Sequence, residues 1–213
     1  MGYHGNMNVL HALEKSCNIF FYDVGRRLGI EKLDAYGTLF GLGQETGLEV
    51  SESSGVLTNP EDYERRSGDT WTDGMTLSAA IGQLDNSFTP VQLVSYCASI
   101  ANGGNRVQLH LVDKITDYTR ENVIEEKGTT ILNEVGVSDE NLAIVRQGMR
   151  LVAQSGTASD FANYGVAIGA KTGTAQVTGH SDNVTFIGFA PYDDPEIAIA
   201  VVLEHGDKST YSK

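Results

Sequence analysis

Two short runs of residues carry the chemistry that this sequence could perform: Ser16-Cys17-Asn18 and Lys171-Thr172-Gly173-Thr174. The second run lies between Val166 and Val177, a stretch of small and β-branched residues that predicts a strand. An unpaired lysine is costly to bury in a strand, and a glycine weakens one unless another backbone approaches closely. A cation, hydroxyls and bare backbone on one strand suit an anionic, peptide-like ligand. The alternative is a surface lysine followed by a bulge.

Ser16 and Asn18 lie at the junction of two predicted helices. The first helix is expected from Asn8 to Lys15 and the second from Ile19 to Leu28, with Gly29 after its end as a C-terminal cap. Serine and asparagine are common at such junctions because their side chains satisfy free backbone N–H groups. Taken alone, the triplet is therefore explained by helix capping.

Three further helices are predicted, over residues 31–40, from Pro90 to about Ala101, and after Ser138. Thr89 is a good N-cap for the Pro90 helix, and an apolar stripe should face the core. The stripe consists of Val91, Leu93, Val94, Cys97 and Ile100. Residues 51–76 are polar and rich in turn formers, which predicts an extended surface excursion. Apolar and polar residues alternate in short runs over residues 107–128, which predicts a small β excursion.

Three strands are predicted near the end of the chain, over residues 166–177, Val184 to Ala190 and Ile197 to Leu203. Their connections are too short for crossover helices, so the strands should be antiparallel. The last strand is apolar on both faces, which predicts helices on both sides of the sheet. The expected fold is of the α/β type with segregated elements (α+β): an antiparallel sheet covered by helices, next to an all-helical part.

Composition excludes several classes of function. The 213 residues are 40% apolar and 20% charged, which is ordinary for one globular domain. The net charge of −13 disfavours non-specific binding to nucleic acid or to anionic membranes. The glycine-rich residues 41–47 match no nucleotide-binding motif. Cys17 and Cys97 form neither a disulfide framework nor a metal-ligand spacing.

The ordered motifs resemble the penicillin-recognising serine acyltransferases, which carry S-x-x-K, S-x-N and K-T-G in that order. Here Ser16-Cys17-Asn18 matches the second motif and Lys171-Thr172-Gly173 the third. Further stretches are similar to class B penicillin-binding proteins, the monofunctional peptidoglycan transpeptidases, and the resemblance covers nearly the whole chain. These stretches are Gly2-Tyr3-His4-Gly5, Ser16 to Phe21, Ile81-Gly82-Gln83, Thr89 to Leu93, Ala101 to Gly104, Lys171 to Gln176 and Phe186 to Pro191.

The sequence departs from the family pattern in two ways. No S-x-x-K, the motif that holds the family's nucleophilic serine, occurs among the 213 residues. In the family the last strand is followed by a helix that packs on the sheet, whereas this sequence stops soon after that strand. We therefore expect residues 1–213 to be a partial transpeptidase domain that is inactive alone. Ser181-Asp182-Asn183 also spells the second motif, but it follows K-T-G and is predicted to be a turn.

The resemblance implies acyl transfer through a covalent serine ester on D-Ala-D-Ala stem peptides. By this resemblance Ser16 relays a proton and Asn18 binds the substrate amide. Lys171 supplies the positive charge that binds a carboxylate and stabilises developing negative charge. Thr172 and Thr174 would bind the substrate carboxylate, and Gly173 would let the acyl chain add as a β-strand. The backbone N–H of Thr174 would form half of an oxyanion hole. No metal or organic cofactor is implied.

The resemblance also implies partners and a location. The expected ligands are peptidoglycan stem peptides and β-lactam antibiotics, the expected partners are other cell-wall synthesis proteins, and nucleic acid is excluded. The expected location is the extracytoplasmic face of the bacterial cell membrane, with the anchor outside this chain. Two other functions fit the same fold: a non-catalytic β-lactam sensor domain and a serine β-lactamase. The second would need a base to activate water, and no segment here matches one.

Overall fold

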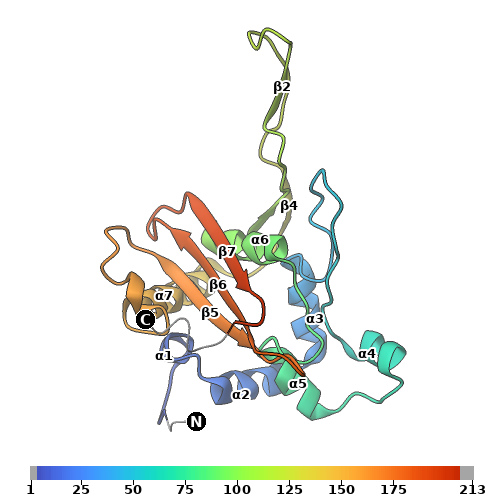
Figure 1. Cartoon of the computed structure of the whole chain (residues 1–213). Coiled ribbons are helices and arrows are strands. Elements are labelled where there is room, and N and C mark those ends of the chain that lie inside the picture. Colours follow the sequence, from blue (N-terminus) through green and yellow to red (C-terminus); the bar gives the residue numbers. More distant parts are fainter. Residues whose placement is uncertain (1–3, 207–213) are drawn as a thin grey trace.

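The computed structural model describes residues 4–206, so the Gly2-Tyr3 part of the first family-like stretch lies outside the described residues. Among the described residues six helices come first, then four short strands, then α7 with the short η1, and last a three-stranded sheet (Figure 1). The helices are α1 (Val9–Glu14), α2 (Asn18–Leu28), α3 (Ile30–Leu39), α4 (Pro60–Ser67), α5 (Asp73–Ala80), α6 (Pro90–Ala101), α7 (Asp139–Gln154) and the short 3-10 helix η1 (Ser159–Phe161). The strands are β1 (Asn105–Val107), β2 (Lys114–Thr116), β3 (Val123–Glu126), β4 (Ile131–Glu134), β5 (Gly169–Ala175), β6 (Asn183–Ala190) and β7 (Ile197–Leu203).

The main sheet has the order β5-β6-β7 and is antiparallel throughout, as the short connections predicted. Lys171 pairs with Ile187 and Gly173 with Thr185, so these four side-chain positions share one face of the sheet. Thr172 and Thr174 lie on the opposite face. Among the described residues β5 is an edge strand, because it pairs with β6 alone.

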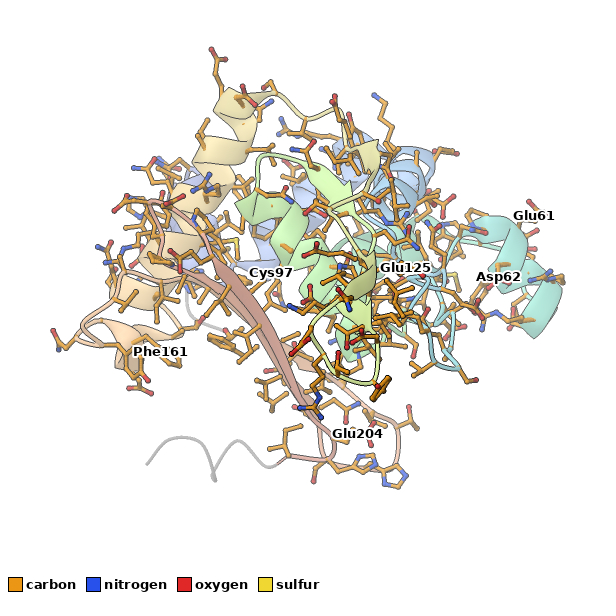
Figure 2. The ribbon with its side chains drawn as sticks, turned by 90° about the horizontal axis from the view of Figure 1, so that it is seen from above. Glu61, Asp62, Cys97, Glu125, Phe161 and Glu204 are labelled. Carbon is orange, nitrogen blue, oxygen red and sulfur yellow. The ribbon has the colours of Figure 1, made fainter. Side chains whose placement is uncertain are left out.

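The core lies between this sheet and the helices α6 and α7. Helix α6 packs against β7 and α7 against β5, behind the sheet in the view of Figure 1. The buried residues of this core include Cys97, Met149 and Phe189. Seen from above, Cys97 lies near the middle of the molecule, with Phe161 and Glu61 toward opposite sides (Figure 2). The predicted combination of antiparallel sheet and covering helices is therefore present.

The other face of the sheet is only partly covered within the described residues. Near β5 and β6 that face is packed by a second cluster, in which the Phe161 ring of η1 lies 5.3 Å from the Phe186 ring. Along β7 the outward row is exposed instead. Its members are Ile197, Ile199, Val201 and Leu203, which are 40–68% exposed. The expectation that both faces of the last strand are covered is thus not met by residues 4–206.

The predicted β excursion forms a projecting arm. Strand β1 pairs with β4, and β2 pairs with β3, in two small antiparallel ladders. The arm extends away from the rest of the chain (Figure 1). Strands β2 and β3 are mostly exposed, and Tyr118, in the turn between them, has 98% of its surface accessible.

The expected surface excursion over residues 51–76 is wrong in part, because it contains α4 and the start of α5. The capping signals of α4 are present in the sequence. Asn59 accepts a hydrogen bond from the Asp62 N–H, Pro60 occupies the first turn, and Gly68 ends the helix in the left-handed conformation with φ 77°. Neither helix has a buried residue, so no apolar stripe marks them.

The predicted stripe of α6 is also partly wrong. The helix and its Thr89 cap are confirmed, and Thr89 forms a capping box with Gln92. However, Gln92, Ser95 and Ser99 are buried on this helix together with Cys97 and Ile100. Gln92 is buried because its side-chain amide donates to the carbonyls of Gln44 and Ser54 at 2.6 and 2.7 Å. A polar residue can thus occupy the core face where loop carbonyls need a donor.

Helices α1 and α7 are joined through the carboxylate of Glu14, which is 6% exposed. It accepts hydrogen bonds from His11 and Ser155 and pairs with Lys15, at 2.8–2.9 Å. The hydrogen bond from His11, with those from Lys15 and Ser155, lowers the pKa of Glu14 to about 2. Gly156 packs so closely that a Cβ there would lie 2.4 Å from the Glu14 carbonyl oxygen.

Replacing Glu14 with Ala should lower the free energy of unfolding by about 1–3 kcal/mol, the usual range for a lost charge-assisted hydrogen bond. The folded-state pKa lies below the ordinary value of 4.5. The stabilisation is therefore present above about pH 4.5 and is lost as the pH falls toward 2. Urea denaturation at several pH values measures both effects. The exposed Glu45 is the control, and equal stability of the Glu14→Ala and Glu45→Ala variants would contradict the role of Glu14.

Candidate active site

Ser16 lies in the tight turn between α1 and α2, with a positive φ of 49°. The turn is fixed by backbone hydrogen bonds from Ser16 N to Leu13 O and from Cys17 N to Ala12 O. The capping interpretation of Ser16 is wrong, because Cys17 occupies the N-cap of α2 and makes no side-chain capping bond. The Ser16 hydroxyl instead accepts a hydrogen bond from Lys171 Nζ at 2.6 Å. The two motifs of the sequence therefore meet, 155 residues apart along the chain.

Lys171 is placed for this contact by the pleat of β5, which directs its side chain to the same face as Ile187. Its ammonium group also donates to the Thr172 carbonyl oxygen at 2.6 Å. Within the described residues it pairs with no carboxylate. Burial lowers the pKa of Lys171 to about 8 from the ordinary 10.5. At neutral pH the group is therefore mostly protonated, so it can hold an anion and donate hydrogen bonds.

This environment predicts that Lys171 titrates near pH 8. Between pH 8 and 10.5 the unfolded chain then binds more protons than the folded chain, so stability should rise with pH across that window. The ¹³Cε shift of Lys171, followed by NMR against pH, measures the pKa. Replacement by Met should remove the rise in stability. Titration of Lys171 near its ordinary value of 10.5 would show that it is not desolvated.

The free edge of β5 presents the backbone of Thr172 and Thr174. The carbonyl oxygens of both residues accept hydrogen bonds from side chains outside β6, from Lys171 and from Gln83 respectively. Residues two apart on a strand direct their N–H and C=O groups to the same edge. Thr174 N–H therefore faces the free edge as well. This edge can receive an extended ligand chain by adding a strand.

Two contacts around the K-T-G segment were missed by the sequence reasoning. The Thr172 hydroxyl lies 2.6 Å from the hydroxyl of Thr157, in the segment that follows α7. Gly173 faces Thr185 on β6, and a Cβ at Gly173 would lie 2.3 Å from the Thr185 hydroxyl oxygen. A side chain at this position would therefore force the Thr185 hydroxyl to move, in addition to hindering the predicted approach of a ligand. Nothing in the sequence around Thr157 indicated its partner.

Asn18 is the first residue of α2, two residues after Ser16. Within residues 4–206 its side chain makes no hydrogen bond, so its amide is free to contact a ligand. The second S-x-N-like triplet lies elsewhere, in the turn from β5 to β6, as predicted. Its Asn183 begins β6 and accepts a hydrogen bond from the His205 N–H at 2.9 Å. Asn183 therefore joins the ends of two strands.

The geometry defines a site where a helical junction bearing Ser16 and Asn18 meets the free edge of a strand bearing Lys171. The sequence matches the penicillin binding protein transpeptidase domain over residues 2–213. The chain therefore belongs to the penicillin-binding-protein transpeptidase family. Within the described residues, no helix is long and apolar enough to cross a membrane.

Two curated relatives are similar to nearly the whole of this chain. The chain is 35% identical over 219 residues to the peptidoglycan D,D-transpeptidase MrdA of Acinetobacter baumannii, covering 95% of this chain and 32% of that protein. It is 31% identical to penicillin-binding protein H of Bacillus subtilis, with coverage of 95% and 32%. The chain thus spans about a third of the length of these curated relatives.

Solved structures agree with the fold. The structure of PBP2 from Pseudomonas aeruginosa in complex with WCK 5153 superposes with a TM-score of 0.82 at 31% identity, covering 96% of this chain and 46% of that one. PBP2 in complex with MreC from Helicobacter pylori superposes with a TM-score of 0.80 at 30% identity, covering 95% and 37%. These matches confirm the predicted fold class.

Proposed function

We propose that this chain supplies the proton-relay and substrate-binding side of a peptidoglycan D,D-transpeptidase of class B. The observation that carries the proposal is the 2.6 Å hydrogen bond from Lys171 to Ser16, which unites the two motifs at the free edge of β5. A buried cation beside a hydroxyl and a strand edge suits a peptide that ends in a carboxylate. The similarity to MrdA supports the same reaction class.

The attacking serine lies outside these 213 residues, because the sequence contains no S-x-x-K. Its hydroxyl oxygen attacks the carbonyl carbon between the two terminal D-alanines, and the peptide C–N bond breaks as the serine ester forms. Ser16 relays a proton to the leaving amine of the last D-alanine. An amine of a neighbouring stem peptide then attacks the ester and releases the serine, which leaves a cross-link between the two peptides.

The remaining residues position the substrate. Lys171 on one face of β5 and the hydroxyls of Thr172 and Thr174 on the other flank the free edge, where they hold the terminal carboxylate, while Asn18 holds the substrate amide. Gly173 permits close approach of the acyl chain along β5. The Thr174 N–H, which faces the free edge, stabilises the developing oxyanion.

We extend the proposal to location and partners. The reaction places the protein at the extracytoplasmic face of the bacterial cell membrane, where stem peptides occur, with the anchor outside this chain. The MreC complex of the Helicobacter pylori protein supports assembly with other cell-wall synthesis proteins. β-Lactams are expected to acylate the full-length protein in place of the stem peptide.

Labelling of the full-length protein with a fluorescent penicillin tests the proposal. The expected result is a stable adduct, together with release of D-alanine when two stem peptides are cross-linked. Rapid hydrolysis of the adduct would instead favour a β-lactamase. A stable adduct without any cross-linking would favour a sensor domain. Either outcome would overturn the transpeptidase assignment.

Asn18 and Asn183 provide a matched pair for testing the second motif. Replacing Asn18 with Ala in the full-length protein should slow acylation strongly, because the substrate amide loses its partner. Replacing Asn183 with Ala should affect acylation little, since its side chain binds the His205 backbone just after the end of β7. Stopped-flow acylation kinetics compare the two variants, and greater sensitivity at Asn183 would reverse the assignment.

A further inference from the structure

Gln83 connects the helical part of the protein to the catalytic strand. It lies in the turn after α5, and its side-chain Nε2 donates a hydrogen bond to the Thr174 carbonyl oxygen at 3.2 Å, 91 residues away in the chain. The sequence reasoning gave Gln83 no role beyond membership of a family-like stretch. We propose that Gln83 is a positioning residue that holds the Thr174 end of β5 in register with Ser16 and Asn18. This inference rests on the proposed function and deepens it.

The turn that carries Gln83 is fixed on both sides. Gln83 N donates to the Ser78 carbonyl at 3.0 Å, and the Asn86 amide donates to the Gln83 carbonyl at 3.1 Å. Asn86 also accepts a hydrogen bond from Thr58 N at 3.0 Å. Leu84 adopts a φ of 66°, a left-handed conformation that is unfavourable for a residue other than glycine. The surrounding hydrogen bonds hold the turn in this shape, which limits where the Gln83 side chain can point.

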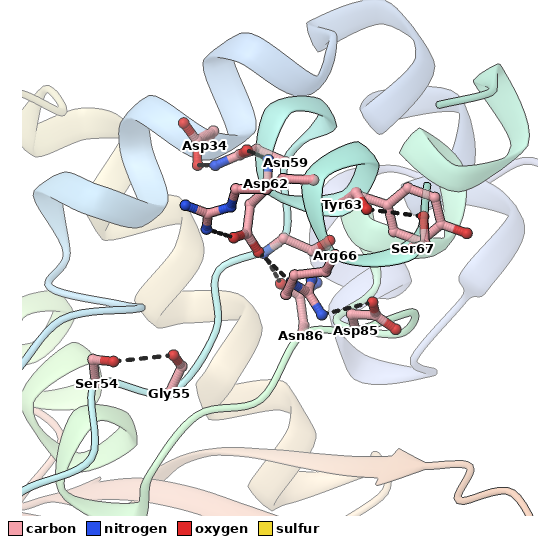
Figure 3. A network of polar contacts seen from close by, with 12 residues as sticks. Asp34, Ser54, Gly55, Asn59, Asp62, Tyr63, Arg66, Ser67, Asp85 and Asn86 are labelled. Carbon is pink, nitrogen blue, oxygen red and sulfur yellow. Dashed lines mark hydrogen bonds and ion pairs between the residues drawn. The ribbon is translucent and has the colours of Figure 1, made fainter. Parts of the chain in front are cut away.

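The same turn is anchored to neighbouring helices. Arg66 of α4 pairs with Asp85 at 3.1 Å and with Asp62, as Figure 3 shows. Helix α5 itself packs against α2, the helix that begins at Asn18. The contact is tight: a Cβ on Gly25 of α2 would lie 2.4 Å from the Ala80 Cβ. Gln83 is therefore carried by the same helical unit that presents Asn18.

Two contacts then attach this unit to β5. Lys171 meets Ser16 at one point, and Gln83 meets Thr174 three residues further along. Three residues of strand span about 10 Å. One contact alone would leave the strand free to pivot, whereas two fix its direction as well as its distance. The second contact acts on Thr174, whose N–H faces the free edge and is assigned to the oxyanion.

The hydrogen bond from Gln83 to Thr174 could instead occupy the place of a ligand, and its removal would then have a different effect on ligand binding. A ligand strand added to β5 would offer its own N–H to the Thr174 carbonyl. If Gln83 only occupied that acceptor until a ligand arrived, its removal would tighten ligand binding. A carbonyl oxygen has two lone pairs, so the side-chain amide and a ligand N–H can be accepted together. The anchored turn favours the positioning role.

The test replaces Gln83 with Met, which keeps the volume and removes the donor. In the full-length protein, acylation by penicillin is resolved into the binding constant Kd and the acylation rate constant. We expect the rate constant to fall about tenfold to hundredfold with little change in Kd, as misplacement of reacting groups by about 1 Å produces. Gln44→Met is the matched control, because Gln44 donates its amide to the Thr38 carbonyl away from the site.

A second measurement uses the 213-residue chain without any acylation. Loss of the hydrogen bond should move the Thr174 carbonyl ¹³C resonance in Gln83→Met and leave it in place in Gln44→Met. If Gln83→Met does not fold, Gln83→Glu carries the test, because it is isosteric and its carboxylate lacks N–H donors. An unchanged acylation rate constant would overturn the positioning role, as would a tighter Kd without a slower rate. If the unsubstituted protein is not acylated, the proposed function fails, while the ¹³C resonance still reports on the contact.

Discussion

Replacing Lys171 with Ala should slow acylation of the full-length protein by penicillin about 10²–10³-fold, the usual effect of removing one preorganised charge or donor. The side chain contributes the hydrogen bond to Ser16 at 2.6 Å and the positive charge at the strand edge. It pairs with no carboxylate of the described residues, so its removal leaves no buried charge behind. Burial of the ammonium also disfavours the folded state, as the lowered pKa shows. The variant should therefore fold normally.

The measurement is the rate of labelling by a fluorescent penicillin, with the thermal midpoint recorded in parallel. Lys114→Ala is the matched control, because Lys114 is also a strand lysine but lies exposed on β2 in the projecting arm. The control should be labelled at the normal rate. Near-normal labelling of a folded Lys171→Ala variant would contradict the role given to this lysine.

The site could be predicted from sequence because its two motifs carry unusual residue types for their local structures. A lysine in a strand of small residues requires a partner, and Ser16 supplies it. The order and separation of the motifs indicated that a helical junction would face a sheet. Sequence alone could not show which function the junction serves, because the same serine suits helix capping. The tight turn at Ser16 and the placement of Cys17 at the N-cap show that Ser16 does not cap α2, and its role in proton transfer stays a prediction.

The contacts from residues between the motifs could not be predicted, because each depends on tertiary packing. Gln83 reaches Thr174 only after α5 packs on α2, and Thr157 reaches Thr172 only after α7 packs on β5. Gln92 is not part of the predicted apolar stripe of α6, and its burial could not be foreseen because its two carbonyl acceptors lie in a distant loop. Local pattern identifies apolar faces, whereas buried polar side chains depend on partners that the pattern does not contain.

The predicted helices and strands were most accurate where an apolar period coincided with a cap. Helix α7 begins after Ser138 as predicted, and the Ser138 side chain accepts from the Asn141 N–H; the helix buries Leu142, Met149 and Val152. Helix α4 lacks such a period and was missed, although Asn59 and Pro60 marked its start. Capping residues can therefore indicate a helix even in a polar stretch.

The second large effect is expected for the 213-residue chain itself, which should form no stable covalent adduct with a β-lactam. Acylation requires an activated serine, and activation requires a base within hydrogen-bond reach. Ser16 does have an amine nearby, but Lys171 donates to it with a mostly protonated group. In our account Ser16 relays a proton and does not attack. In the same account the nucleophile and its own N–H, the other half of the oxyanion hole, are not among these 213 residues.

Intact-mass spectrometry of the 213-residue chain after incubation with excess penicillin tests this account most directly. The chain should keep its unmodified mass, while the full-length protein, treated in parallel, should gain the mass of one penicillin. The site of attachment in the full-length protein, mapped by peptide sequencing, should lie outside these 213 residues. A stoichiometric adduct of the chain alone, mapped to Ser16, would show that Ser16 is the nucleophile and would contradict the account.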